Sequence, residues 1–324
     1  MNRHGYDEIK EKFHLLLNCW EQGSSKNLDQ CLMKEAACYM SIEESYPEGG
    51  RHGIFGMSDF LDTLPETKVC HIVPYNFVAR VEGKKGQQSA VACGIAGRQN
   101  QEQFEVCEFC GIFSNEWMLT ESGWMIKTLR LDVQEATGTF KDYYKDWHFE
   151  DEKGKWYAGM HLPVISGELD NPWKIIVNNE VALNEEEAVL ETFYKYAFGV
   201  DFISFDHLLD VLTDDCIVNM APFGAMDKRE FIQTLKMHRR SVLHWFHPAR
   251  LKSVTIDDDK AELKLYRMGG HRQRHQQVVY TEANIDRQYA CARYELKLRK
   301  NSGRWQIYKF DYFLGIIDLG EYKD

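Results

Sequence analysis

Residues 289–299 read YACARYELKLR, and their alternation of apolar and polar side chains predicts one long β-strand. Because successive side chains of a strand point to opposite faces, one face of this segment is apolar throughout. That face carries Ala290, Ala292, Tyr294, Leu296 and Leu298. A tight turn at Asn301-Ser302-Gly303 follows, and then a further strand that contains Lys309-Phe310-Asp311. The sequence therefore predicts an antiparallel hairpin with one buried face near the end of the chain.

The same landmarks recur about 180 residues earlier, which indicates an internal repeat. The turn Glu121-Ser122-Gly123 corresponds to the later turn, and Arg130-Leu131-Asp132 corresponds to Lys309-Phe310-Asp311. Further upstream in each half, apolar residues at helical spacing predict a long amphipathic helix. These residues are Ile9, Phe13, Leu16, Leu17 and Trp20 in the first half, and Leu190, Phe193, Tyr194 and Ala197 in the second.

The segments between these landmarks also match. A short helix is predicted at 27–33 and at 204–212, and a short strand at 38–42 and at 216–220. A third helix then follows in each half. Two pairs, Asn184 with Glu187 and Asp227 with Glu230, have the spacing of a capping box at the start of a helix. Val69-Cys70-His71 and Val242-Leu243-His244 each open the series of strands that completes a repeat.

This order of helix, helix, strand, helix and four long strands resembles the SnoaL-like group of the nuclear transport factor 2-like superfamily, over residues 6–135 and 185–317. The resemblance implies an α+β fold with two cone-shaped domains. In each, three N-terminal helices pack on a curved, mostly antiparallel sheet around an apolar pocket. The implied boundaries are 1–135 for the first domain and 185–324 for the second. The aromatic-rich connector at 136–184 is expected to be ordered. Because many members pair through their sheets, an internal pseudo-dimer or a homodimer is expected.

Composition restricts the classes of protein. The chain has 324 residues, of which 44% are hydrophobic and 27% charged, with a formal net charge of -11. An acidic chain lacks the positive footprint that binding to nucleic acid or to an anionic membrane needs. The charged start of the chain is unlike a signal peptide, and no stretch has the length and apolarity of a membrane helix. We therefore expect a cytoplasmic protein whose nine cysteines are reduced thiols.

Two neighbouring glutamates are the first candidate catalytic residues. The resemblance places the general base of ketosteroid isomerases just after the first strand, where this chain has Glu43 and Glu44. Because adjacent strand residues point to opposite faces, at most one of them is expected to enter a pocket. The alternative is that both are solvated loop carboxylates. The second repeat has Asn219 and Met220 at this place, so any such base belongs to the first half.

Histidines form the second candidate pair. His71 and His244 each share a predicted strand face with apolar neighbours. An imidazole on an inward face can act as base, acid or substrate anchor. A lone histidine on such a face can equally be a satisfied core residue. For the first half, His71 is the candidate acid or partner of the glutamate base.

A basic residue and an aspartate two positions apart form the third candidate. Arg130 with Asp132, and Lys309 with Asp311, share a strand face and can form salt bridges. An outward pair would be structural, whereas an inward pair would place a carboxylate or an anion clamp in the pocket. Two tyrosines are candidate substrate-binding residues: Tyr39 on the first predicted strand, and Tyr194 on a helix, where a core role is the alternative.

The sequence offers no persuasive metal or cofactor site. His244 with His247, and Cys107 with Cys110, are three residues apart on predicted strands and therefore point to opposite faces. No phosphate-binding glycine loop follows a predicted strand. The resemblance implies a protein that binds a small apolar molecule, and we expect it to need no cofactor. The first domain would catalyse proton transfer as an isomerase, dehydratase or cyclase. The alternative is a non-catalytic binding or protein-interaction module.

Overall fold

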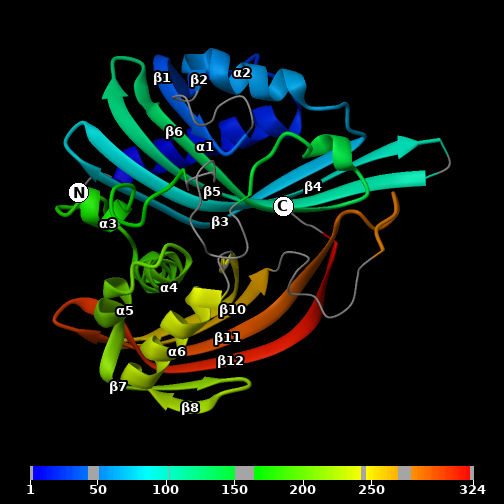
Figure 1. Cartoon of the computed structure of the whole chain (residues 1–324). Helices are drawn as coiled ribbons and strands as arrows, with labels where there is room; N and C mark the ends of the chain where they lie inside the picture. The colour runs from blue at the N-terminus through cyan, green and yellow to red at the C-terminus, as the bar shows by residue number, and fades with distance from the viewer. Residues whose placement is uncertain are drawn as a thin grey trace. The chain divides into compact units, whose positions relative to one another are not determined.

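The computed structural model describes residues 3–42, 51–101, 103–149, 164–241, 246–268 and 279–321, with only the backbone for 51–55, 240 and 241. The chain divides into two compact units (Figure 1). The first unit comprises Met1–Glu150, Tyr157–Ala182 and Val278–Ile285. The second comprises Asp151–Trp156, Leu183–Gln277 and Asp286–Asp324. Part of the predicted connector therefore belongs to the first unit, as does a short segment that precedes the long strand at 289–299.

The first unit begins with helix α1 and ends its sheet with strand β6. In chain order its elements are α1 (Arg3–Glu21), the 3₁₀ turn η1 (Leu28–Gln30), β1 (Leu32–Met40), β2 (Arg51–His52), α2 (Gly53–Thr63), β3 (Val69–Glu82), β4 (Lys85–Asn100), β5 (Gln103–Thr120) and β6 (Gly123–Gly138). The 3₁₀ turn η3 (Lys141–Tyr143) and the short helix α3 (Pro172–Ile175) follow. The strands form one sheet in the order β2-β1-β6-β5-β4-β3.

The second unit repeats this topology. Its elements are α4 (Glu185–Asp201), α5 (Asp206–Val211), β7 (Leu212–Met220), β8 (Gly224–Asp227), α6 (Lys228–Ser241), β9 (Ala249–Asp257), β10 (Lys260–Met268), β11 (Arg287–Asn301) and β12 (Arg304–Glu321). The strand order is β8-β7-β12-β11-β10-β9. In each sheet one pair is parallel, β1 with β6 and β7 with β12, and the other pairs are antiparallel. The two mixed sheets thus confirm the predicted α+β class.

The short helices differ from the prediction. The helix expected at 27–33 is only the 3₁₀ turn η1, and the helix expected at 204–212 ends at Val211. Pairing in the sheet is the physical reason, because Leu32 lies opposite Ile126 and Leu212 lies opposite Ile307. Strands β1 and β7 therefore start earlier than expected. The strand predicted to open at Val242 falls outside the described residues, and β9 begins at Ala249.

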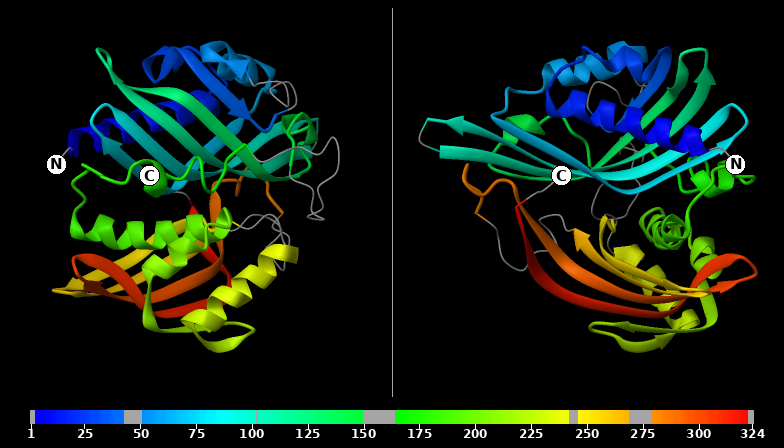
Figure 2. Two further views of the ribbon diagram at one scale, coloured as in Figure 1. Left: turned by 60° about the vertical axis from the view of Figure 1, so that its left-hand side comes forward. Right: turned by 180° about the vertical axis from the view of Figure 1, so that it is seen from behind.

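Strands β11 and β12 form the hairpin predicted from 289–299. All five apolar residues of the predicted inward face are at most 2% exposed. Tyr294, Leu296 and Leu298 belong to the apolar core beneath α4, α5 and α6, which cover one face of the second unit's sheet (Figure 2). The turn between the strands uses positive φ at Ser302 and Gly303, the backbone that a two-residue hairpin turn requires. Burial of one continuous apolar face therefore fixes the register of this hairpin.

Aromatic rings fill the core of the first unit. The Trp20 ring from α1 lies 5.2 Å from both Phe60 and Phe109, and its indole N–H donates to the Tyr143 hydroxyl at 3.2 Å. Tyr143 and Trp147 come from the predicted connector, and both rings also pack on Phe109. The described part of the connector therefore contributes aromatic side chains to the core of the first unit. It closes the interior of the unit with large side chains.

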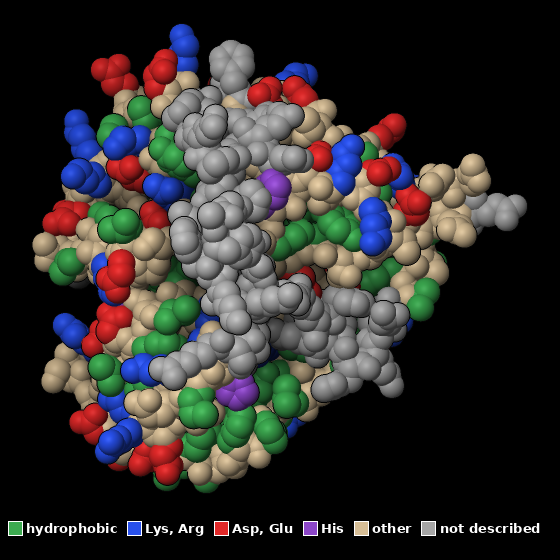
Figure 3. Space-filling model, viewed as in Figure 1, with side chains coloured by type: hydrophobic (Ala, Val, Ile, Leu, Met, Phe, Trp, Pro, Cys, Tyr) green, Lys and Arg blue, Asp and Glu red, His purple; other side chains and the backbone are tan. Residues whose placement is uncertain are grey.

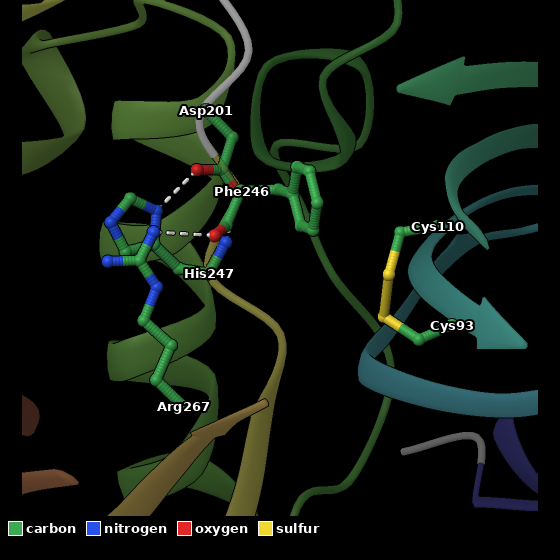
Figure 4. The surroundings of a disulfide bond; sticks show 6 residues. All are labelled: Cys93, Cys110, Asp201, Phe246, His247 and Arg267. Atoms are coloured by element: carbon green, nitrogen blue, oxygen red, sulfur yellow. Dashed lines mark hydrogen bonds and ion pairs between the residues drawn. A yellow bond between two sulfur atoms is a disulfide. The ribbon is translucent and has the colours of Figure 1, made fainter. Parts of the chain in front are cut away.

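The cysteines correct one expectation. Cys93 on β4 and Cys110 on β5 face each other across the sheet, with Cα atoms 4.2 Å apart, and form a disulfide (Figure 4). The two thiols are cross-strand neighbours, a relation that only the register of β4 and β5 reveals. Not all nine cysteines are therefore reduced. The other seven are free thiols, six of them buried.

Charged side chains of both signs are interspersed on the face of the molecule shown in Figure 3. Among the described residues, no helix is long and apolar enough to cross a membrane.

The capping box at the start of α4 can be tested by substitution. The Asn184 side chain accepts from the Glu187 backbone N–H at 2.9 Å, and the Glu187 carboxylate accepts from the Asn184 N–H at 2.9 Å. Asn184→Ala removes half of this capping box and should lower the free energy of unfolding of the second unit by about 1 kcal/mol. Asn184→Asp keeps the acceptor and should retain most of the stability. Urea unfolding of both variants measures the difference, and equal losses would contradict the capping role.

Candidate functional site

A buried aspartate and a buried histidine meet in the second unit. Asp201 is the last residue of α4, and His247 precedes β9. Asp201 Oδ1 lies 2.5 Å from His247 Nδ1, and Asp201 Oδ2 accepts from the His247 backbone N–H at 3.0 Å. Figure 4 shows the carboxylate directed at the imidazole. Since a carboxylate only accepts, Nδ1 carries the hydrogen, and Nε2 of the neutral ring carries the lone pair.

The surroundings keep this imidazole neutral. His247 is 3% exposed, and burial lowers its pKa to about 4. The positive charge of Arg267 lowers the pKa further, and that of Arg239 also contributes. The Asp201 carboxylate acts in the opposite direction without overcoming these effects. Desolvation disfavours the charged form of an isolated ring, so the histidine is a neutral base at pH 7.

Two guanidinium groups flank the pair. Arg239 on α6 donates to the Asp201 backbone carbonyl at 2.9 Å. Arg267 on β10 donates from Nη2 to the Phe246 carbonyl at 2.8 Å (Figure 4). Its Nη1 donates to the Tyr312 hydroxyl at 3.0 Å. Both arginines are less than 10% exposed. Buried charges of this kind persist only where the fold supplies hydrogen bonds, so their positions are closely defined.

Three tyrosines complete this group. The Tyr196 ring from α4 lies 6.1 Å from the His247 ring. Tyr294 on β11 lies directly opposite Tyr312 on β12, with ring centroids 5.0 Å apart. We refer to these side chains together as the buried polar cluster. Its members are Tyr196, Asp201, Arg239, His247, Arg267, Tyr294 and Tyr312. All of them belong to the second unit.

The first unit has the same backbone contact at the end of its first helix but lacks the buried polar side chains of the second unit. Glu21 ends α1 as Asp201 ends α4, and its Oε1 accepts from the backbone N–H of Ile72 at 2.5 Å. Ile72 therefore occupies the place of the histidine. Pro74 follows Ile72 by two residues and lies opposite Ala92 on the neighbouring strand. In the second unit Ala249 follows His247 by two residues and lies opposite Arg267. The first unit thus has an isoleucine and an alanine where the second has an imidazole and a guanidinium.

The candidate glutamates Glu43 and Glu44, and His244, lie outside the described residues. His71 is half-buried on β3 between Cys70 and Ile72. The Cys70 sulfur lies 3.6 Å from the Tyr143 hydroxyl, so Cys70 faces the aromatic core. Strand alternation then places His71 on the opposite face of the sheet. His71 therefore faces away from the aromatic core of the first unit.

The basic–acidic pairs lie outside both interiors. Leu129, Leu131 and Val133 are buried on one face of β6, so Arg130 and Asp132 point to the other. Arg130 pairs with Asp170 at 2.9 Å rather than with Asp132, and its guanidinium lies 4.6 Å from the Tyr39 ring centre. Asp132 is itself buried. The salt bridge that Arg130 and Asp132 could form is therefore replaced by an ion pair between Arg130 and Asp170 of the connector.

The corresponding residues of the second unit form the expected contact. Lys309 lies 3.2 Å from Asp311, whose carboxylate also accepts from Asn219 at 2.5 Å. Tyr194 is partly buried against the apolar core of its unit, with its ring 6.5 Å from Phe193. The tyrosine that reaches the buried polar cluster is Tyr196, two residues further along α4.

The sequence held a signal for the residues that were missed. In β10, Ala261, Leu263 and Leu265 alternate on the buried face, and Arg267 is the next residue of that series. A basic residue in a core-facing position is unusual unless it has partners. No group of three or more His, Cys, Asp or Glu side chains within the described ranges could hold a metal ion.

One comparison with known proteins concerns the second half of the chain. Residues 181–311 match the family model of the SnoaL-like domain. No curated protein is similar in sequence. Solved structures that resemble part of the chain include the Kfla4162 protein of Kribbella flavida. It has 11% identity and a TM-score of 0.38, and the match covers 42% of this chain and 95% of that one.

Two further structures align to a similar extent. A nuclear transport factor 2-like superfamily protein of Salmonella enterica has 14% identity and a TM-score of 0.34, with 44% and 99% of the two chains covered. A hexachlorocyclohexane dehydrochlorinase of Novosphingobium barchaimii has 12% identity and a TM-score of 0.34, with 50% and 93% covered.

The buried histidine makes the stability depend on pH. The folded state keeps His247 neutral down to pH about 4, whereas an unfolded histidine binds a proton below about pH 6.5. The stabilisation is therefore complete above pH 6.5 and is lost as the pH falls towards 4, by about 3 kcal/mol. Urea unfolding at several pH values measures this slope. His247→Gln should flatten it, and an unchanged slope would show that other groups cause it.

The carboxylate of the pair can be tested by removing its charge. Asp201→Asn keeps one acceptor oxygen but replaces the other with an amide donor that faces an N–H of His247, and it should lower the free energy of unfolding by about 1 to 3 kcal/mol. Asp210→Asn is the matched control, because Asp210 forms an exposed ion pair with Lys195 that is worth less than about 1 kcal/mol. Thermal and urea unfolding compare the two. Equal losses of unfolding free energy in the two variants would contradict a larger contribution of the buried Asp201 carboxylate to stability.

Proposed function

We propose that the second unit binds a small organic molecule and moves a proton on it without a cofactor, with His247 as the base. The contact between Asp201 and the His247 Nδ1 carries this proposal. A carboxylate that accepts from Nδ1 fixes the tautomer and the orientation of the ring. It also stabilises the imidazolium that forms once Nε2 takes a proton. The match of residues 181–311 to the SnoaL-like domain supports the choice of this unit.

The proposed reaction begins with a carbon–hydrogen bond next to a carbonyl group. His247 Nε2 takes the proton, and the electron pair of the broken bond moves onto the carbonyl oxygen to give an enolate. The imidazolium then returns the proton to the same carbon or to another one. The second outcome is an isomerisation, with no net gain or loss of electrons or atoms. A neutral imidazole at pH 7 is the protonation state that the first step needs.

The first unit has a supporting role in this proposal. Trp20, Phe109 and Trp147 fill its interior, and Ile72 replaces the catalytic imidazole. Proton transfer by Glu43 or Glu44 in that unit stays a prediction, because both residues lie outside the described ranges. The alternative function is a non-catalytic ligand-binding or protein-interaction module. For the first unit, the packing of Trp20, Phe109 and Trp147 against one another supports this alternative.

The test follows the exchange of carbon-bound hydrogen for deuterium by NMR. A set of cyclic ketones and 1,3-diketones is incubated with the protein in deuterium oxide. Wild-type protein should accelerate exchange in at least one compound, and His247→Gln should reduce that acceleration by about 100-fold or more. His71→Gln is the control histidine variant and should retain the wild-type rate. Equal rates for wild type and His247→Gln, or no acceleration across the set, would contradict the proposal.

A further inference from the structure

A short segment just before β11 is packed on the first unit, although β11 itself belongs to the second. Residues 279–285 fall in the first unit, and the second unit resumes directly after them. At the start of β11, Arg287 Nε donates to the Asp318 carboxylate on β12 at 2.9 Å. Gln288 accepts from Arg250 on β9 at 2.6 Å. Neighbouring parts of one stretch are therefore anchored in different units. We refer to residues 279–285 as the clasp.

The clasp is packed closely on the end of strand β4. Ile285 is 2% exposed and lies directly against Gly97, where a Cβ atom would be only 2.5 Å from Ile285 Cδ1. The Phe104 ring of β5 lies against the same point. A glycine within a strand often marks a place where another segment approaches the backbone closely. Gly97 therefore makes room for the Ile285 side chain.

Two polar contacts accompany this apolar one. The Tyr280 hydroxyl donates to Glu108 Oε1 at 2.6 Å. Strand pairing of β4 with β5 places Glu108 on the same face of the sheet as Gly97. Glu282 forms an ion pair with Lys68, but both side chains are exposed, so this pair contributes little to stability. The clasp is thus attached mainly through Ile285 and Tyr280.

The clasp also has hydrogen bonds of its own. The Asn284 side chain accepts from the Thr281 backbone N–H at 2.6 Å and donates to the Val279 carbonyl at 3.1 Å. The Asn284 N–H donates to the Thr281 carbonyl at 3.1 Å. A segment with internal bonds of this kind loses less conformational freedom when it docks.

The strands on either side of the clasp end beside the buried polar cluster. Eighteen residues connect β10 to β11, whereas two connect β4 to β5. Connections of such length are uncommon in compact domains. Met268 ends β10 opposite Ala290, and its N–H donates to the carbonyl of Pro248, the residue after His247. Arg267 directly precedes Met268. The end of this strand pair is therefore bonded to the neighbours of the proposed base.

We infer that the first unit is a docking platform for the clasp, and that docking keeps the end of the β10–β11 pair in the arrangement that the buried polar cluster needs. The first unit thereby controls the order of the second unit's candidate site. Segments with few buried apolar contacts open most readily, and within 279–285 only Ile285 is buried. This inference goes beyond the proposed function, since it holds whether or not His247 acts as a base.

The test measures backbone amide hydrogen exchange of the full chain by mass spectrometry. Ile285→Ser removes the apolar side chain that docks on Gly97. Exchange within 279–285 should become about tenfold faster or more, because local opening no longer exposes a large apolar group. Exchange within 262–268 and 287–292 should rise by about threefold or more, since these strand ends lose their support. Peptides from β6 should exchange as in wild type.

A second variant changes the first unit and leaves the clasp intact. Gly97→Val places a side chain where Ile285 docks, and valine is well accepted within a strand. It should give the same pattern of faster exchange as Ile285→Ser. Val279→Ser is the matched control, because Val279 belongs to the clasp but is 78% exposed. This control should exchange as wild type does.

Circular dichroism and thermal unfolding verify that the variants are folded, and Tyr280→Phe provides a milder change of the same contact. Faster exchange of 262–268 and 287–292 in the folded clasp variants supports the inference. Unchanged exchange of these two segments in Ile285→Ser and Gly97→Val, or an equal change in Val279→Ser, overturns it.

This inference and the proposed function fail in different ways. If wild-type protein accelerates exchange in none of the ketones, the proposed base is wrong, yet amide exchange still decides whether the clasp supports the second unit. If catalysis depends on His247 while Ile285→Ser changes neither amide exchange at 262–268 and 287–292 nor the catalytic rate, the proposed function stands and the clasp has no such role.

Discussion

Burial of the Arg267 guanidinium is the constraint to which the interior of the second unit is adapted. A buried charge is tolerated only where hydrogen bonds replace the water that it has lost. Here the Phe246 carbonyl and the Tyr312 hydroxyl provide two such bonds. They fix the chain just before β9 and one side chain of β12 in relation to β10. His247 follows Phe246 directly, so the same bonds help to place the imidazole against Asp201.

The two units show how one topology can hold two different interiors. Both units have the same strand order. In both, the carboxylate of the last residue of the first helix accepts from a backbone N–H: Glu21 from Ile72, and Asp201 from His247. That backbone contact is a structural feature of each unit. In the second unit the residue that donates it is a histidine, and the surrounding positions carry arginines and tyrosines. In the first unit Ile72 and Ala92 stand where the second has His247 and Arg267, and aromatic rings pack in the core.

The connector accounts for much of that difference. Tyr143 and Trp147 extend the aromatic core of the first unit, while Asp170 forms an ion pair with Arg130 on the other face of the same sheet. The Asp170 backbone carbonyl also accepts from the Ser114 hydroxyl at 2.6 Å. The described connector segments therefore contact both faces of the sheet.

The sequence by itself determined the repeated element order, the α+β class and the hairpin of β11 and β12. It also determined two capping boxes, Asn184 with Glu187 and Asp227 with Glu230, and both pairs exchange backbone-to-side-chain hydrogen bonds. These features depend on local periodicity and on residues a few positions apart, which a single chain displays directly. Even there, the short helices were predicted too long, because pairing of Leu32 and Leu212 in the sheets overrides local helix propensity.

Only the tertiary structure decided which polar residues meet. Asp201 and His247 are 46 positions apart, and Arg267 and Tyr312 are 45 apart, so no local pattern links them. The disulfide of Cys93 and Cys110 likewise follows from the register of two strands. For His71, the face of the strand was ambiguous, since apolar neighbours occur on both sides of β3. The burial of specific pairs is a property of long-range packing, and it is this packing that moved the candidate site from the first half of the chain to the second.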